Sequence, residues 1–383
     1  MSYPARRLWE VAGLFLKLGT ISFGGPAAHV ALMEQETVSR RGWLSRDHFL
    51  DLLAATNLVP GPNAVEMASH IGFVRAGWPG LVAGGLSFIL PATLISLALS
   101  WAYVRFGALP QVEALFYGIN PAVVAIILTA TYRLGSSALR DRRAIVVAVL
   151  CLMAALLGVN EVLLLLGAGL AGVLLYAPPR LPGWPWLVVS CGPLAAVLSA
   201  SPPWLDDRLV RLGLFFLKVG ALLFGSGMVL FAFIQGDVVG RYGWLTQRQL
   251  LDAIAVGQMT PGPVLSTATF IGYLVAGLPG ALVSTLAVFL PSFLIVALVG
   301  PWIPRLRRWP TAQAFLSGVN AAVVALLVAV TVALFRSAVV DVWTVAILLA
   351  SLMALLRFRV DTLWLVLGGA ICGLAHYLAV RAW

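Results

Sequence analysis

The sequence predicts an all-α protein that crosses a membrane repeatedly and consists of two homologous halves of opposite orientation. Of the 383 residues, 61% are hydrophobic and only 10% are charged, and the mean hydropathy is +0.98. A soluble chain of this length could not bury so much apolar surface, so its solvent is lipid. The apolar runs lack the alternation of barrel strands, which favours spanning helices. Motifs of the first half recur in order in the second half.

The repeat is visible motif by motif. Pro60-Gly61-Pro62 recurs as Pro261-Gly262-Pro263, and Leu50-Asp51 recurs as Leu251-Asp252. Further pairs keep almost the same register along the chain: Gly42-Trp43-Leu44 with Gly243-Trp244-Leu245, Ile71-Gly72 with Ile271-Gly272, and Leu90-Pro91 with Leu290-Pro291. We therefore expect a first repeat over residues 1–180, a Pro- and Trp-rich linker over 181–207 that dips into the membrane interface, and a second repeat over 208–383.

Spanning helices need about 20 apolar residues each, and the sequence offers about ten such segments. We expect them at residues 9–32, 77–102, 112–133, 143–158, 160–177, 210–234, 277–303, 312–335, 340–356 and 360–380. The two Pro-Gly-Pro motifs lie between the first two spans of each half, in stretches of mixed polarity near 45–75 and 246–275. Because proline interrupts a continuous helix, each stretch is predicted to be a re-entrant helical hairpin buried in protein or lining a wet cavity.

Positive charge is distributed oppositely in the two halves. The loop after the first span contains Arg40, Arg41, Arg46 and Arg75, whereas its twin contains only Arg241 and Arg248. On the other face the bias reverses, with Arg105 matched by Arg305, Arg307 and Arg308. Basic residues mark the cytoplasmic side, so the halves are predicted to face opposite ways, with the N-terminus outside. Many secondary transporters use such an inverted repeat for alternating access.

Several function classes are disfavoured. The net charge is +10, but the arginines occupy short loops and no basic helix or zinc pattern is present, so we expect no nucleic-acid partner. The histidines and cysteines lack metal-ligand spacing, which predicts no metal and no cofactor. Acidic and histidine side chains are sparse and unclustered, which argues against an enzyme.

Four motifs together resemble the chromate ion transporter family, in its long two-domain branch. They are Ser22-Phe23-Gly24-Gly25-Pro26, Arg41-Gly42-Trp43-Leu44, Asn57-Leu58-Val59-Pro60-Gly61-Pro62-Asn63 and Thr260-Pro261-Gly262-Pro263. The resemblance covers essentially the whole chain. It implies a multi-pass protein of the bacterial inner membrane that exports chromate, confers chromate resistance and is driven by the proton motive force. One departure is that the second copy of the first motif, Phe224-Gly225-Ser226-Gly227, lacks the proline, so the two copies are expected to have unequal roles.

Alternatives to this function stay open. A transporter or exchanger of sulfate or another oxyanion is the nearest, since the anions are similar. A membrane-embedded enzyme or a lipid scramblase is more distant. The bilayer is an expected partner in every case, and a homodimer is compatible with the sequence.

A tetrahedral dianion could bind at the breaks in the helices. Freed N–H groups and the positive end of a half-helix attract oxyanions, and glycines let the backbone approach the ligand. Lys17 and Lys218 are the only lysines, and both follow Phe-Leu in matching positions. They would add charge, unless they snorkel to the headgroups instead. The predicted substrate-binding set is Lys17, Lys218, Phe23, Gly24, Gly25, Phe224, Gly225, Ser226, Pro60, Gly61, Pro62, Asn63, Pro261, Gly262 and Pro263.

Three carboxylates are candidates for carrying a coupled proton. Asp51 and Asp252 match each other on the helices that enter the Pro-Gly-Pro turns, and Glu66 follows the first turn without an acidic twin. A carboxylate at membrane depth favours its neutral form and can exchange a proton.

Two further matched pairs are predicted to have supporting roles. Asn120 and Asn320 lie within long apolar helices, where they either bond across helices or line the pathway. Glu36 and Asp237, just beyond the first span of each half, are expected to be loop charges.

Overall fold

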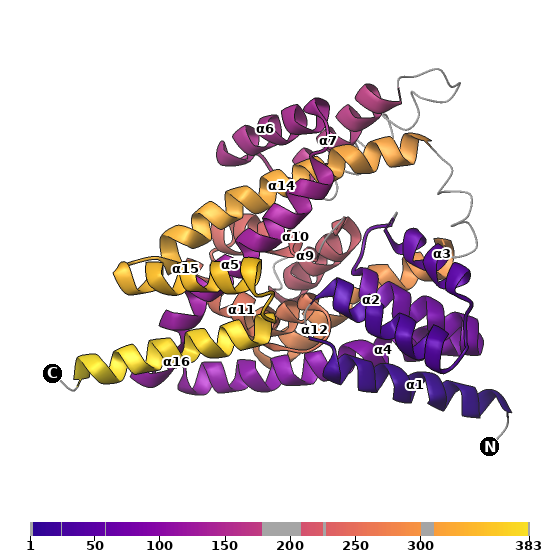
Figure 1. Ribbon diagram of the computed structural model, residues 1–383, viewed down its shortest axis with the longest axis horizontal. Helices are drawn as coiled ribbons and strands as arrows, with labels where there is room; N and C mark the ends of the chain where they lie inside the picture. Colours follow the sequence, from indigo (N-terminus) through magenta and orange to yellow (C-terminus); the bar gives the residue numbers. More distant parts are fainter. Residues whose placement is uncertain are drawn as a thin grey trace.

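The computed structural model describes residues 3–23, 25–57, 59–177, 208–224, 227–299 and 310–381, and every regular element within them is a helix (Figure 1). The all-α prediction is confirmed. The predicted linker over 181–207 and three predicted site residues, Gly24, Gly225 and Ser226, lie outside the described residues.

Both halves contain the same order of elements. The helices of the first half are α1 (Tyr3–Ile21), α2 (Pro26–Glu34), η1 (Gln35–Arg40), α3 (Arg46–Thr56), α4 (Asn63–Phe106), α5 (Pro110–Ala138), α6 (Arg142–Leu156) and α7 (Glu161–Tyr176). Those of the second half are α9 (Arg208–Leu222), α10 (Val229–Phe233), η2 (Ile234–Arg241), α11 (Gln247–Met259), η3 (Val264–Ser266), α12 (Thr267–Val299), α14 (Pro310–Ala338), α15 (Val342–Arg357) and α16 (Thr362–Arg381).

The first predicted span of each half is wrong as a single helix. Residues 9–32 divide into α1, which ends at Ile21, and α2, which begins at Pro26. Residues 210–234 divide in the same way into α9 and α10. The break in the first half follows from its sequence, because Gly25 adopts a φ of +83° and Pro26 starts a new helix at its first turn.

The Pro-Gly-Pro turns end one helix and begin another, as predicted. In the first half, α3 ends at Thr56 and α4 begins at Asn63. In the second half, α11 ends at Met259 and the 3₁₀ turn η3 begins at Val264. Each exit helix then runs on into the next predicted span through a kink, in which Gly77 has a φ of +65° and Gly277 a φ of +63°.

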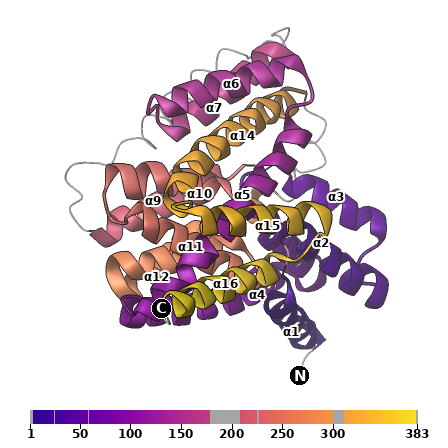
Figure 2. The ribbon, with the colours of Figure 1, turned by 60° about the vertical axis from the view of Figure 1, so that its left-hand side comes forward.

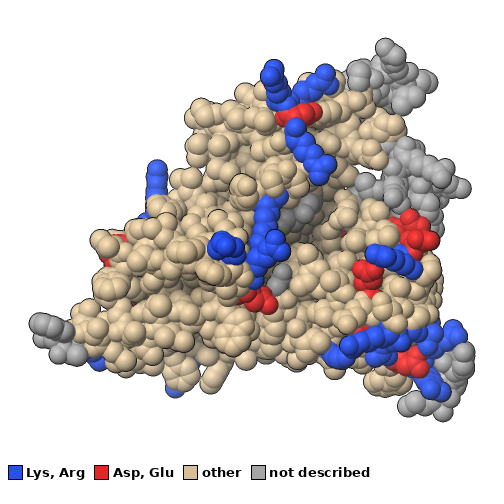
Figure 3. All heavy atoms as spheres, in the orientation of Figure 1, with Lys and Arg blue, Asp and Glu red and all other residues tan. Residues whose placement is uncertain are grey.

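The remaining predicted spans correspond to α5, α6, α7, α14, α15 and α16. By length and composition, α4, α5, α14, α16 and the continuous η3–α12 segment can each cross a membrane, and α7 and α15 are shorter apolar helices. The face shown in Figure 3 is mostly uncharged, and its Lys, Arg, Asp and Glu side chains are confined to a few clusters. These features establish an all-α multi-pass membrane protein.

The two halves interlock through small residues. On α5, Gly118 approaches α16 so closely that a Cβ atom would lie 2.0 Å from the Gly369 carbonyl oxygen. On α14, a Cβ atom built on Gly318 would likewise lie 1.9 Å from the Ala168 carbonyl oxygen of α7. Helix α5 therefore packs on α16, and α14 packs on α7, so each pair joins the two halves. Figure 2 shows α14 beside α7.

Candidate functional site

Each Pro-Gly-Pro turn contacts the helix break of the opposite half. The Gly61 N–H donates to the Leu223 carbonyl over 2.7 Å, and the Gly262 N–H donates to the Ser22 carbonyl over 2.9 Å. We call the contact of the Pro60–Pro62 turn with the break between α9 and α10 the first crossing. The second crossing is the contact of the Pro261–Pro263 turn with the break between α1 and α2. Four of the predicted substrate-binding motifs thus meet in two matched pairs.

The first crossing contains a buried acid. Gly61 has a φ of +151°, and a Cβ atom built on it would lie 2.1 Å from Glu66 Oε1 and 2.8 Å from Ser292 Oγ of α12. Glu66 is 0% exposed and Ser292 is 1% exposed. Neither carboxyl oxygen of Glu66 nor the Ser292 hydroxyl is hydrogen-bonded to a described residue. The carboxyl group and the hydroxyl therefore pack on one face of the same glycine.

The second crossing is lined by hydroxyls. Thr260 Oγ1 and Ser266 Oγ are 3.0 Å apart, and the hydroxyl of Ser96 on α4 donates to the Ser266 carbonyl over 3.0 Å. The Ser22 hydroxyl is buried and makes no hydrogen bond with a described residue. His29 Nε2 of α2 lies 3.1 Å from the Ser22 carbonyl oxygen. At this crossing, the Ser22 hydroxyl is therefore buried with its donor unused by any described residue.

Gly262 has more space around its Cα atom than Gly61 has. Its φ is +89°, and a Cβ atom there would approach Ala92 Cβ to 3.4 Å and the Gly19 carbonyl to 3.5 Å, both ordinary contact distances. The turn and the break at this crossing therefore leave more room than those at the first.

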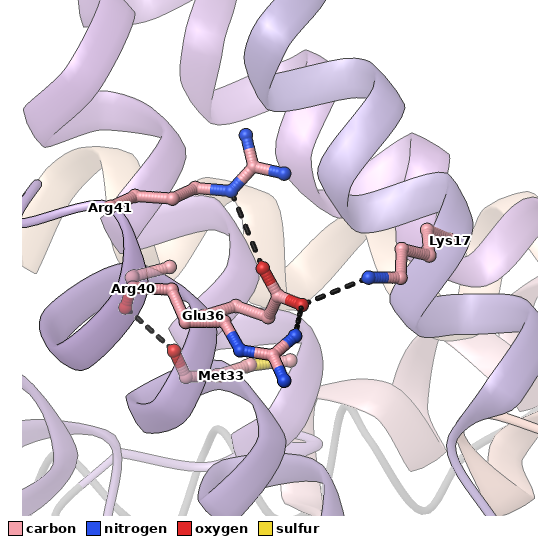
Figure 4. Close-up of polar contacts among 6 residues, drawn as sticks. Lys17, Met33, Glu36, Arg40 and Arg41 are labelled. Atoms are coloured by element: carbon pink, nitrogen blue, oxygen red, sulfur yellow. Dashed lines mark hydrogen bonds and ion pairs between the residues drawn. The ribbon is translucent and has the colours of Figure 1, made fainter.

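Lys17 belongs to a four-membered charge cluster (Figure 4). Its Nζ atom donates to Glu36 Oε1 over 2.9 Å, and Arg40 Nη1 donates to the same oxygen over 2.9 Å. Arg41 Nε lies 3.4 Å from Glu36 Oε2. The hydrogen bond from Lys17 holds the pKa of the Glu36 carboxyl below its ordinary value. Three cations around one carboxylate leave the cluster with a net positive charge.

Lys218 makes the matching pair with Asp237, but this pair is deeply buried. The side chains are 10% and 3% exposed, compared with 49% for Lys17. Beside it lies a cavity of about 440 Å³ between α7, η2 and α14, whose lining includes Asp237, Glu161 and Gln235. The expectation that Glu36 and Asp237 are loop charges is wrong, because the chain resumes helix after each break and brings these acids back onto α1 and α9.

Asp252 and Asn120 lie together. The Tyr103 hydroxyl donates to Asp252 Oδ2 over 2.7 Å, and Asn120 Nδ2 donates to Asp252 Oδ1 over 3.0 Å. Asp252 is 2% exposed. Its two hydrogen-bond donors, Tyr103 and Asn120, both come from the first half. Its repeat partner Asp51 is exposed on α3, and Asn320 is half-buried on α14. The predicted matched acids therefore have unlike surroundings.

Other predicted residues occupy the edges of the crossings. Asn63 begins α4 and donates from Nδ2 to Asn57 Oδ1 over 2.6 Å, which bridges the first Pro-Gly-Pro turn. The Phe224 ring packs edge-on against Phe315 of α14, and Phe23 is half-buried.

Sequence reasoning missed Ser292, Tyr103 and Glu161. Ser292 departs from Ala92 at the matching position of the first half, and this difference could have been noticed. Neither Tyr103 nor Glu161 carries a local signal, because the contact of Tyr103 with Asp252 and the place of Glu161 beside Asp237 in the cavity lining arise only where elements of opposite halves meet.

Comparison with known proteins gives a consistent result. The sequence model of the chromate transporter family matches residues 9–173 and again residues 210–374. The chain is 37% identical over 353 residues to the chromate transport protein of Cupriavidus metallidurans, covering 89% of this chain and 86% of that protein. It is 36% identical over 351 residues to a probable chromate transport protein of Synechococcus elongatus, covering 89% and 88% of the two chains.

A further relative matches about a third of the chain. An uncharacterized transporter of Bacillus subtilis is 29% identical over 126 residues, which are 33% of this chain and 71% of that protein. No solved structure matches the chain.

Proposed function

Because this chain belongs to the chromate transporter family, we propose that it transports chromate as a secondary active exporter coupled to the proton gradient across a bacterial inner membrane. The observation that carries the proposal is the pair of crossings, where a broken helix of one half contacts a Pro-Gly-Pro turn of the other. Broken helices at an interface between repeats are where many secondary transporters bind their substrates.

The second crossing is the proposed oxyanion site. The uncapped N-terminus of α2 begins there at Pro26, directly after Gly25, and helix N-termini attract anions through free N–H groups and their dipole. The buried Ser22 hydroxyl has an unused donor. No carboxylate of the described residues is hydrogen-bonded at this crossing. A tetrahedral dianion would meet donors without a repelling negative charge.

Lys17, on α1, is proposed to act on the approach to this site, and Lys218, on α9, has the matching position beside the first crossing. Lys17, with Arg40 and Arg41, forms a half-exposed cluster whose net positive charge would raise the local concentration of a dianion. Lys218 is neutralised by Asp237 inside the protein. An anion that takes the place of Glu36 on Lys17 would leave that carboxylate paired with Arg40 and Arg41, whereas an anion on Lys218 would leave Asp237 buried without its cation.

The Pro-Gly-Pro turns are proposed to re-enter rather than cross the membrane. Helix α3 has 11 residues and so is about 16 Å long at 1.5 Å per residue. The hydrocarbon core is about 30 Å thick, roughly twice that length. A turn reached by such a helix would lie at depth, where its irregular backbone needs the protein contacts that Gly61 and Gly262 make.

Uptake of radiolabelled chromate into inverted membrane vesicles tests the function. We expect accumulation when a proton gradient is imposed and none when it is collapsed, with excess sulfate as the competitor that reports how strictly chromate is preferred. Vesicles without the protein are the control. Absence of gradient-dependent accumulation in sealed vesicles contradicts proton-driven chromate export, and sulfate uptake at a higher rate than chromate assigns the protein to sulfate.

A further inference from the structure

The two crossings differ chemically, because residues that line the first have no equivalent at the second. At the first crossing, Glu66 and Ser292 pack on Gly61. At the second, the corresponding positions on the exit helix and on the crossing helix are filled by Ser266 or Thr267 and by Ala92. Within the described residues, a Cβ atom on Gly61 would meet the Glu66 carboxyl group, whereas one on Gly262 would meet Ala92 and the carbonyl oxygens of Gly19 and Phe88, so the two crossings offer different chemistry.

The surroundings of Glu66 fit a neutral carboxylic acid. The side chain is 0% exposed, and neither oxygen accepts a hydrogen bond from a described residue. An ionised carboxylate in an apolar interior requires donors or a cation, and without them the group takes up a proton. The same acid becomes able to ionise when a rearrangement brings water to it, which is the behaviour of a proton carrier within a membrane.

Among the described residues, groups from three places lie around Glu66. From its own helix there is His70, one turn along α4, whose Nε2 is also buried without a partner. From α12 there is the Ser292 hydroxyl, and from the turn and the α9–α10 break there are Gly61 and the Leu223 carbonyl. Among the described ion pairs and hydrogen bonds, none joins Glu66 to a charged side chain. The local balance between the acid and its carboxylate therefore depends on hydration of the crossing.

The other two acids predicted to carry a proton are less suited to it. Asp252 is already hydrogen-bonded by the Tyr103 hydroxyl and the Asn120 amide, so both of its carboxyl oxygens have donors in the described state. Asp51 is exposed on α3, so the protein does not enclose it. Of the three, Glu66 alone combines complete burial with unused hydrogen-bonding capacity.

We propose that the first crossing is the proton site of the transporter, with Glu66 as the carrier, while the second crossing binds the oxyanion. This division of labour rests on the proposed function. In the described state, Glu66 holds its proton on a carboxyl oxygen and the Gly61 N–H bonds to Leu223. When the Gly61 N–H separates from the Leu223 carbonyl, water reaches Glu66 and accepts the proton, which leaves a carboxylate. The Ser292 hydroxyl and the released Gly61 N–H are the donors positioned to stabilise it, and uptake of a proton from the other side restores the acid.

Reconstituted protein in liposomes tests this division. Two quantities are measured on each variant: exchange of labelled chromate at equal pH on both sides, and chromate-driven proton movement reported by a pH dye inside the liposomes. We expect Glu66→Gln to keep chromate exchange and to lose the proton movement. The matched change at the second crossing, Ser266→Ala, should lower both in proportion and leave the number of protons per chromate unchanged.

A second variant keeps the proposal testable if Glu66→Gln does not fold. Ser292→Ala retains the acid and removes the neighbouring donor to its ionised form, so the pH at which exchange is half-maximal should move upward. An unchanged ratio of protons to chromate in Glu66→Gln, or an unchanged pH profile in Ser292→Ala, overturns the proton site while leaving chromate transport intact. Absence of chromate exchange in the wild-type protein overturns the proposed function instead, and the division of labour with it.

Discussion

Gly61→Ala should damage the protein far more than the matched change Gly262→Ala. Both glycines have positive φ, +151° and +89°, so each alanine incurs backbone strain of about 1–3 kcal/mol. Only at residue 61 does the new Cβ collide with side chains, at 2.1 Å from Glu66 Oε1 and 2.8 Å from Ser292 Oγ. Overpacking of a filled interior adds about 1–3 kcal/mol, so the two variants should differ by roughly that amount.

The assay is the free energy of unfolding of the purified protein in detergent, followed by the far-ultraviolet circular dichroism of its helices. A third variant, Gly61→Ala/Glu66→Ala, removes the carboxyl that the new methyl group would meet. It should recover part of the loss relative to the sum of the single changes, since the two sites are in contact. Equal destabilisation by Gly61→Ala and Gly262→Ala, or strict additivity in the double variant, would refute the packing described for the first crossing.

Three further predictions concern the charged and polar groups around the crossings. Lys218→Ala leaves Asp237 buried without its cation and should lower the free energy of unfolding by about 3–5 kcal/mol in a denaturation assay. Lys17→Ala removes a half-exposed partner and should lower it by about 0–1 kcal/mol. Similar losses in the two variants would contradict the difference in burial. Tyr103→Phe removes one donor to the buried carboxylate on α11 and should cost about 1–3 kcal/mol, and a neutral effect would mean that this hydrogen bond is not made. Because the pKa of Glu36 lies below its ordinary value of 4.5, its stabilising contribution is complete above pH 4.5 and is lost as the pH falls through the lower, folded-state pKa. Melting temperatures measured across that range should fall less in Glu36→Gln than in wild type, and parallel curves would argue against the cluster.

Much of the fold could be predicted from composition and repetition. Apolar length predicted the long helices, and Pro60-Gly61-Pro62 and its twin predicted the turns, because two prolines that flank a glycine remove two N–H donors from the helix within three residues. The breaks after Ile21 and Leu222 were missed. A mean hydropathy over about 20 residues stays high across a short glycine-rich break, because glycine lowers it only slightly. Residues 9–32 were therefore predicted as one span.

The site could be predicted only as separate motifs. The two glycine-rich breaks and the two Pro-Gly-Pro turns were identified from the repeat, but their pairing across halves depends on how α4 and α12 pack together, which no local pattern encodes. The same limit explains the lysines. Lys17 and Lys218 could be singled out in the sequence as the only two lysines. Their pairing with Glu36 and Asp237 could not be predicted, because it depends on the chain folding back after each break.

The most direct test of this account is the position of chromium in crystals of the protein grown with chromate, located by anomalous scattering at the chromium absorption edge. The account predicts a peak at the second crossing, beside the Ser22 hydroxyl and the backbone of Gly262. A peak beside Glu66 at the first crossing, or in the cavity between α7 and η2, would contradict the assignment of the anion to one crossing and the proton to the other.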